Sequence, residues 1–183
     1  MDKFIQIIDE NDLKPEEIER VVFTLHPIVQ FRLWQENKLR TTEDYCFYAP
    51  FLLGCAAHRI KSTRWLDQDL REDPRIREFM QRVEFEPKID EKAFALAMLK
   101  DPYARPMAVE VTARGRTYKE ETVYLKGAWQ PEEFRSSDEW IIEKFSDNSA
   151  KVLSSDTISE VSKAIFYLDA FENIRDVIEL ISP

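Results

Sequence analysis

Glycine, histidine and cysteine are scarce in this sequence of 183 residues, and each shortage excludes a class of site. The three glycines are too scattered to form a glycine-rich loop around a phosphate group. The two histidines, His26 and His58, have no second histidine or cysteine at the spacing of a metal site. No serine lies in a nucleophile elbow. The residues therefore predict neither a metal nor a cofactor, and they carry no self-contained active site of these kinds.

An excess of positive charge and long apolar runs are also lacking. The formal charge is −9 and the isoelectric point is near 4.9, so the chain is a poor candidate for binding nucleic acid. No apolar run reaches the roughly 18 residues of a membrane span, and charges interrupt the N-terminal segment too often for a signal peptide. Cys46 and Cys55 lie nine residues apart in one apolar segment, which on a helix places them on nearly opposite faces and disfavours a disulfide between them. These features predict a cytoplasmic protein that does not bind membranes.

What the sequence does contain is typical of a globular α+β domain. Apolar residues make up 44% and aromatic residues 12%, which is enough for one core over residues 1–183. Helices are predicted over residues 2–13 with Asp2 as the cap, over 42–60 with an interruption at Pro50, from Pro74, and over about 173–181. Two further helices are expected in the C-terminal third, where Ser136 with Glu139 and Thr157 with Glu160 have capping-box spacing. An apolar stripe follows the second cap: Ile158, Val161, Ile165 and Leu168.

The strongest strand signal lies in the middle of the chain. Met107, Val109, Val111 and Ala113 alternate along one predicted strand face, Gly115 supplies a turn, and residues 117–125 return. Shorter strands are predicted near 21–25 and at 83–86. Together they predict a small antiparallel sheet packed with several helices.

The segment "TTEDYCFYAPFLLGCAAH" (41–58) concentrates the reactive side chains. Cys46 has no neighbour that would lower its pKa, which favours a small core residue over a nucleophile. His58 ends the predicted helix, where it can interact favourably with the helix dipole. His26 and Trp129, elsewhere in the chain, are interpreted as structural.

A basic run follows that segment, and it contains the candidate substrate-binding residues. Arg59 and Lys61, with Arg64, form the only local positive cluster of this acidic chain. Such a cluster can attract a carboxylate substrate or an acidic partner surface. A solvated helix end is the alternative.

Several short motifs follow one another in a characteristic order. The segments "LKPEEIERVVF" and "DPRIREFMQRVEF" come first, and the two middle strands follow with Gly115 at their turn and Gly127 beyond them. A helix containing Lys144-Phe145 and another whose end reads Leu168-Asp169 complete the series. In this order they resemble the C-terminal region of the MmgE/PrpD family, which includes 2-methylcitrate dehydratase, cis-aconitate decarboxylase and iminodisuccinate epimerase.

The resemblance implies a role in a two-part enzyme. Family members are at least about twice as long, and their N-terminal all-helical domain, with most catalytic positions, has no counterpart in this sequence. The chain then corresponds to the lid domain, or a separately encoded small subunit, of a lyase or isomerase acting on a small carboxylic acid or related carbonyl compound. It would form a hetero-oligomer with a helical MmgE/PrpD N-terminal-type subunit, without a cofactor.

The resemblance also singles out one catalytic candidate in the lid. Family members have a helix start similar to A-x-x-S-[LF]-x-Y, whose tyrosine reaches the substrate. On "DYCFYAPF", Cys46 falls on the serine and Ala49 on the tyrosine, with Tyr48 one residue early. A shift of one residue makes Tyr48 the catalytic candidate, whereas an ungapped match leaves the hydroxyl missing. Without a resemblance-based role, Tyr48 would be a buried aromatic whose hydroxyl bonds a backbone carbonyl.

Two further hypotheses follow from these observations. The first is that the chain is a non-catalytic interaction module, because Ala49 stands where the tyrosine is expected. In the second it is a fragment of an ordinary enzyme, cut at a domain boundary.

Overall fold

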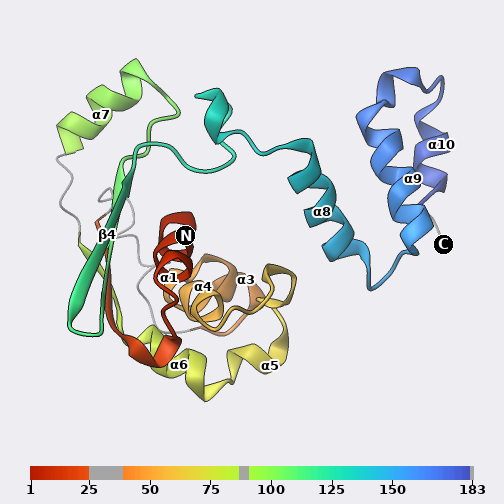
Figure 1. Cartoon of the computed structure of the whole chain (residues 1–183). Helices are drawn as coiled ribbons and strands as arrows, with labels where there is room; N and C mark the ends of the chain where they lie inside the picture. Colours follow the sequence, from red (N-terminus) through yellow and green to blue (C-terminus); the bar gives the residue numbers. More distant parts are fainter. Residues whose placement is uncertain (25–38, 87–90, 182–183) are drawn as a thin grey trace. The chain divides into compact units, whose positions relative to one another are not determined.

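A computed structural model describes residues 1–24, 39–86 and 91–181 (Figure 1). The chain divides into two compact units, Met1–Arg135 and Ser136–Pro183, and each is described by itself. The prediction of one domain over residues 1–183 stays a prediction. His26 and the Leu25 end of the first predicted strand lie outside the described residues.

The first unit is built on a four-stranded sheet in the order β2-β1-β3-β4. Strand bounds are β1 Ile18–Thr24, β2 Val83–Glu86, β3 Met107–Ala113 and β4 Arg116–Thr122. β3 and β4 form the predicted hairpin, in which Ala113 pairs with Arg116 across a turn made by Arg114 and Gly115. Both turn residues have positive φ, 53° and 67°, and glycine adopts that conformation at little cost.

The sheet is mixed, and in this respect the prediction of an antiparallel sheet was wrong. β1 runs antiparallel to β3 but parallel to β2, with Val21 opposite Val83. A parallel pair needs a long crossover connection, and its described part, residues 39–82, includes helices. The α+β class itself is confirmed, because the sheet packs with helices α1 (Asp2–Glu10), α4 (Ala49–Ala57) and α6 (Pro74–Met80).

Three helices of the first unit, α1, α4 and α6, pack with the sheet in one hydrophobic core. The other described helices of this unit are α3 Thr42–Phe47, α5 Gln68–Arg71 and α7 Glu91–Lys100, with 3-10 turns at Pro15–Glu17, Ser62–Arg64 and Glu132–Phe134. The core joins Phe4 of α1, Val111 of β3, Leu53 of α4 and Phe79 of α6, all almost fully buried. Figure 1 shows α1 and α4 on the same side of the sheet.

Two details of the predicted helices need correction. Asp2 is the first residue of α1 and not its cap, since the preceding residue, Met1, occupies that position. The segment 42–60 forms two helices, because the chain turns to extended backbone at Tyr48 before α4 starts. Pro50 lies in the first turn of α4, where a missing N–H costs nothing, so the predicted late helix start is confirmed.

The second unit contains α8 Asp138–Ser149, α9 Ser155–Phe166, a 3-10 turn Leu168–Ala170 and α10 Ile174–Glu179. The cap of α8 lies one residue later than the sequence suggests, and the cap of α9 lies three residues earlier. Ser137 rather than Ser136 caps α8, and Ser154 rather than Thr157 caps α9, because the capping hydroxyl must stand immediately before the first helical residue.

The apolar stripe of α9 is shorter than predicted. Ile158 and Val161 are buried, but Ile165 is 55% and Leu168 42% exposed. Leu168 follows the end of α9 and so leaves the helical period on which the prediction depended. The second unit therefore leaves many large apolar side chains uncovered within its own structure.

Candidate functional site

The segment that the sequence singled out begins with a well-capped helix. Thr41 Oγ1 accepts a hydrogen bond from Asp44 N at 3.3 Å. The Asp44 carboxylate accepts bonds from the backbone N–H groups of Thr41 and Arg40, each at 2.8 Å. These bonds lower the pKa of Asp44 and satisfy amides that a helix start leaves open. They fix where α3 begins and therefore where Tyr45 and Tyr48 lie.

Tyr48 lies in a second hydrophobic cluster, between α3 and α4. The buried members of this cluster are Tyr45, Tyr48, Phe51, Cys55, Leu70 and Ile76. Tyr45 and Phe51 form an edge-to-face aromatic pair with ring centroids 4.8 Å apart. The Tyr48 side chain is 6% exposed, and burial raises the pKa of its hydroxyl.

This placement matches the alternative in which Tyr48 is a buried aromatic side chain. Ala49, the position that aligns with the family tyrosine, is the first residue of α4 and is partly exposed. Ala49 has no hydroxyl, and the neighbouring hydroxyl at the start of α4 belongs to Tyr48, whose side chain packs in the second hydrophobic cluster. The catalytic role of Tyr48 stays a prediction.

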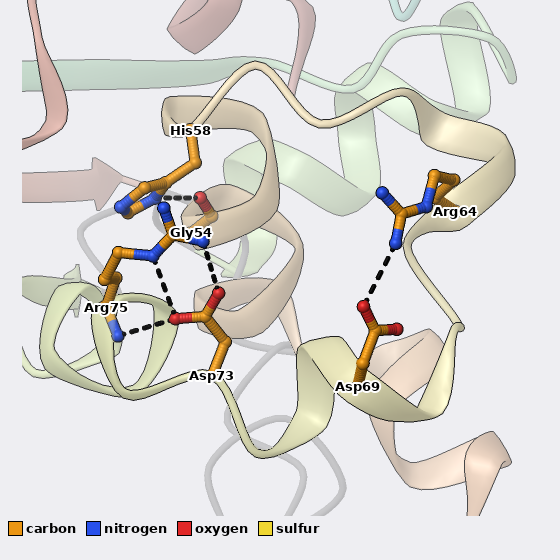
Figure 2. Close-up of polar contacts among 6 residues, drawn as sticks. All are labelled: Gly54, His58, Arg64, Asp69, Asp73 and Arg75. Carbon is orange, nitrogen blue, oxygen red and sulfur yellow. Dashed lines mark hydrogen bonds and ion pairs between the residues drawn. The ribbon is translucent and has the colours of Figure 1, made fainter.

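Two arginines of the predicted basic run have carboxylate partners. Arg59 pairs with Asp9 of α1 and donates from Nη2 to the carbonyl oxygen of Ile8 at 3.3 Å. Arg64 pairs with Asp67 at 2.9 Å. It also pairs with Asp69 at 3.0 Å, as Figure 2 shows. Lys61 is exposed and precedes the turn Ser62–Arg64. Two of the three basic side chains of the run are therefore engaged in ion pairs within the unit, and substrate binding by Arg59 and Lys61 stays a prediction.

His58 ends α4 beside an acidic helix cap. Its Nδ1 lies 2.9 Å from the Gly54 carbonyl oxygen, so the neutral ring donates from Nδ1 and keeps Nε2 as an acceptor (Figure 2). The bond ties His58 to the last turn of α4, and the predicted interaction with the helix dipole stays a prediction. His58 also lines a hollow of about 220 Å³, which it shares with Arg75, Glu78 and Arg82 among others.

Asp73 caps α6 and is held by Arg75. Its carboxylate accepts bonds from Arg75 N at 2.9 Å, from Nε at 3.1 Å and from Nη2 at 2.7 Å (Figure 2). The Arg75 side chain is the main reason why the pKa of Asp73 falls to about 2. Burial is the main reason why the pKa of Cys55 rises to about 12, and the charge of Asp73 adds to that rise. Both groups are therefore in fixed states at neutral pH, one ionised and one a thiol.

Sequence analysis did not identify two arginines that line one hollow of the first unit. Arg71 of α5 and Arg77 of α6 border a space of about 370 Å³ together with Leu39, Tyr45, Met80 and Gln81. The two residues are six positions apart and flank a helix break at Pro74, so no sequence period links them. The only sequence feature that pointed to this hollow was the presence of arginines close to a helix that begins at a proline, and that feature is a weak signal.

The two cysteines and Trp129 lie in surroundings that are typical of structural residues. Cys46 is half-buried and Cys55 fully buried, and both are free thiols. The Arg135 guanidinium lies 4.0 Å from the centre of the exposed Trp129 ring and donates to its carbonyl oxygen at 2.7 Å. Within residues 1–24, 39–86 and 91–181, no group of three or more histidine, cysteine or acidic side chains could hold a metal ion. No helix in these ranges is long and apolar enough to cross a bilayer.

Comparison with known proteins adds one finding. Residues 1–165 match the family model described as the MmgE/PrpD C-terminal domain. The match covers the sheet, the helices on it, and α8 with most of α9. No curated protein matches the chain.

Proposed function

The chain belongs to the MmgE/PrpD C-terminal domain family, and from that premise we propose that it is the lid domain or small subunit of a lyase or isomerase of this type. It acts with a helical catalytic half, which is supplied by a second chain or by residues outside this sequence. The substrate is a small carboxylic acid or a related carbonyl compound. The observation that carries the proposal is the family match over residues 1–165.

The proposed reaction begins with removal of a proton next to a carboxylate or carbonyl group. Loss of water or of CO₂, or return of the proton on the other face, then gives dehydration, decarboxylation or epimerisation. The helical half supplies most acid and base groups. This chain contributes closure over the substrate and exclusion of water, which strengthens electrostatic interactions around the reacting atoms.

The second unit supports the existence of a partner surface. Large apolar side chains of α9, α10 and the residues next to them are exposed within this unit: Ile165, Phe166, Tyr167, Leu168, Phe171, Ile174, Ile178 and Ile181. Apolar groups gathered in this way are typical of a protein interface. A helical partner fits, because α9 and α10 can present ridges to the grooves of another helix.

A second candidate function is a non-catalytic interaction module. The specific observation in its favour is that Ala49 aligns with the family tyrosine while Tyr48 packs in the core at 6% exposure. Such a module would keep the apolar surface of the second unit and lose the chemistry. Turnover in the assembled complex separates the two functions.

Co-expression with a helical MmgE/PrpD N-terminal-type chain tests the proposal. We expect a hetero-oligomer on size-exclusion chromatography, with lyase or isomerase activity toward small carboxylic acids. The double variant Ile165→Ser/Ile174→Ser should weaken the complex, since both side chains are more than half exposed on the proposed surface. Val152→Ser is the matched control, because Val152 is 80% exposed and lies between α8 and α9.

Different failures have different meanings. A complex without any turnover would favour the interaction module. Absence of both a complex and activity would sink the proposal. Equal weakening by Val152→Ser and by the double variant would remove α9 and α10 as the partner surface.

A further inference from the structure

We propose that the hollow between α3, α5 and α6 binds the carboxylate of a small organic acid through Arg71 and Arg77. The inference rests on the proposed function and deepens it by assigning a binding site to the substrate class. It depends on contacts within the first unit alone. The hollow has a volume of about 370 Å³, enough for a small organic acid.

Arg71 directs its hydrogen bonds to uncharged acceptors, and the nearest charge shown to act on it is that of Glu43. Its Nη2 donates to Thr42 Oγ1 at 2.9 Å and to the Leu66 carbonyl oxygen at 2.8 Å, and both acceptors are uncharged. Its Nε is buried and has no hydrogen-bond partner, and it is the one buried side-chain nitrogen or oxygen with this property among the residues that the structure describes. A buried donor without an acceptor is costly, so an incoming oxyanion would gain a charge-assisted bond there.

Arg77 is placed beside Arg71 by backbone contact. Arg77 Nε donates to the carbonyl oxygen of Arg71 at 3.0 Å, and Nη2 pairs with Glu72 at 2.8 Å. The Glu72 side chain is 73% exposed, so solvent screens this pair. These bonds leave Nη1 of Arg77 available for a further acceptor. Two guanidinium groups therefore border one hollow, and their planar forks match the geometry of a carboxylate.

The other walls favour an organic acid over a bare inorganic anion. The Arg71 guanidinium carbon lies 5.4 Å from the centre of the Tyr45 ring, and Leu39 and Met80 add apolar surface. Gln81 adds an amide that can donate or accept. The acidic balance of the chain, −9 overall, disfavours a highly charged ligand such as phosphate.

Binding at Arg71 should be visible directly. Because Nε is closed to solvent, a ligand oxygen reaches it only when the guanidinium turns toward the hollow. The Nε–Hε signal of Arg71 in a ¹⁵N-labelled chain should therefore move as ligand is added. Tyr45 ring signals should move with it, because the ring stacks against the same guanidinium.

The experiment is a titration of the ¹⁵N-labelled chain with succinate, followed by NMR. Parallel titrations use inorganic phosphate and, at equal ionic strength, sodium chloride. We expect saturable shifts of the Arg71 Nε–Hε and Tyr45 signals with succinate, and none with sodium chloride. Arg77→Gln should weaken succinate binding about tenfold, the loss expected for one charge-assisted hydrogen bond. Arg116→Gln removes the same charge from an exposed position at the start of β4, and this variant should bind succinate as the original chain does.

A second variant keeps the test independent of folding. Arg71 ties α5 to Thr42 and so can be needed for stability. Met80 is only partly buried at the edge of the second hydrophobic cluster, so Met80→Glu introduces a carboxylate into the hollow at a side chain that solvent still reaches. Met80→Glu should abolish binding of succinate while the chain still gives a dispersed spectrum. Saturable shifts that survive in both Arg77→Gln and Met80→Glu would overturn the proposal. Absence of saturable shifts in the original chain, or tighter binding of phosphate than of succinate at the same signals, would also overturn it.

Failure of this site is distinguishable from failure of the proposed function. Succinate binding by a chain that forms no active complex supports the site and contradicts the lyase role. An active complex in which Arg77→Gln leaves both kcat and KM unchanged contradicts the site alone.

Discussion

The Arg59 guanidinium, at the end of α4, forms an ion pair with the Asp9 carboxylate, near the end of α1. The same side chain reaches the carbonyl oxygen of Ile8, so one residue joins the C-terminal ends of two core helices. Arg59 also has a positive φ of 53°, which an L-residue adopts with strain. Arg59, which the sequence analysis proposed as a substrate-binding residue, thus links the ends of α1 and α4.

Substitutions at Arg59 should separate the strain from the ion pair. Arg59→Gly and Arg59→Ala both remove the pair with Asp9, but glycine adopts positive φ without a Cβ penalty. We expect the glycine variant to be more stable than the alanine variant by about 1 kcal/mol in urea denaturation. Equal stabilities would show that the left-handed conformation carries no cost here.

Gly54 should not tolerate a methyl group. A Cβ at this position would lie 2.9 Å from Ile76 Cγ2 and 3.4 Å from the Ile76 carbonyl oxygen. Gly54→Ala should therefore lower the free energy of unfolding by about 1–3 kcal/mol, because α4 and α6 would have to separate. In an Ile76→Ala background the same substitution should cost less. An identical cost in both backgrounds, measured by chemical denaturation, would show that Ile76 is not the obstacle.

Asp73 should make stability depend on acid pH. Its pKa lies below the ordinary value of 3.8, at about 2, so the ionised form is favoured by folding. The resulting stability is present above the ordinary value and is lost as the pH falls through the window from 3.8 to about 2. Asp73→Asn keeps a capping side chain but should be less stable by about 1 kcal/mol at neutral pH.

Thermal unfolding across this pH range measures the effect. The difference between Asp73→Asn and the original chain should shrink toward pH 2. Asp69→Asn is the control, because the Asp69 side chain is 66% exposed in its pair with Arg64 (Figure 2). A difference for Asp73→Asn that stays constant with pH would contradict an ionic contribution from Asp73.

The two cysteines should react at very different rates. Cys55 is fully buried with a pKa of about 12, whereas Cys46 is half-buried. The thiolate is the reactive species, so iodoacetamide at pH 8 should modify Cys46 first and leave Cys55 intact in the folded chain. Peptide mass spectrometry identifies the modified residue, and both should react in denaturant. Early modification of Cys55 would mean that α4 opens readily.

Tyr48→Phe tests the chemistry of the lid. If the Tyr48 hydroxyl acts on substrate, the variant complex should lose about 10²-fold or more in kcat with little change in unfolding temperature. Ala49→Tyr, which places a hydroxyl at the aligned position, is the companion variant. Turnover that neither substitution changes would favour the interaction module over a catalytic lid.

The local elements were largely predictable because their signals lie within a few residues. The alternation Val109, Val111, Ala113 gave the buried face of β3, and Gly115 gave the hairpin turn. Pro50 and Pro74 marked the starts of α4 and α6. The family resemblance, based on ordered short motifs, is confirmed by the match over residues 1–165. Cap positions were wrong by one or three residues, because several serines and threonines near each helix start compete for the same role.

The site was less predictable, because its properties depend on partners distant in sequence. The sequence by itself determined the alternation of apolar residues, the turns, the scarcity of metal ligands and the family. Only the tertiary structure decided that β2 joins β1 in parallel, that Tyr48 packs in the core, and that Arg59 pairs with Asp9. It also brought Arg71 and Arg77 to one hollow. The physical reason is that burial and charge neutralisation depend on which elements pack together, and that packing is a property of the whole core and not of any one segment.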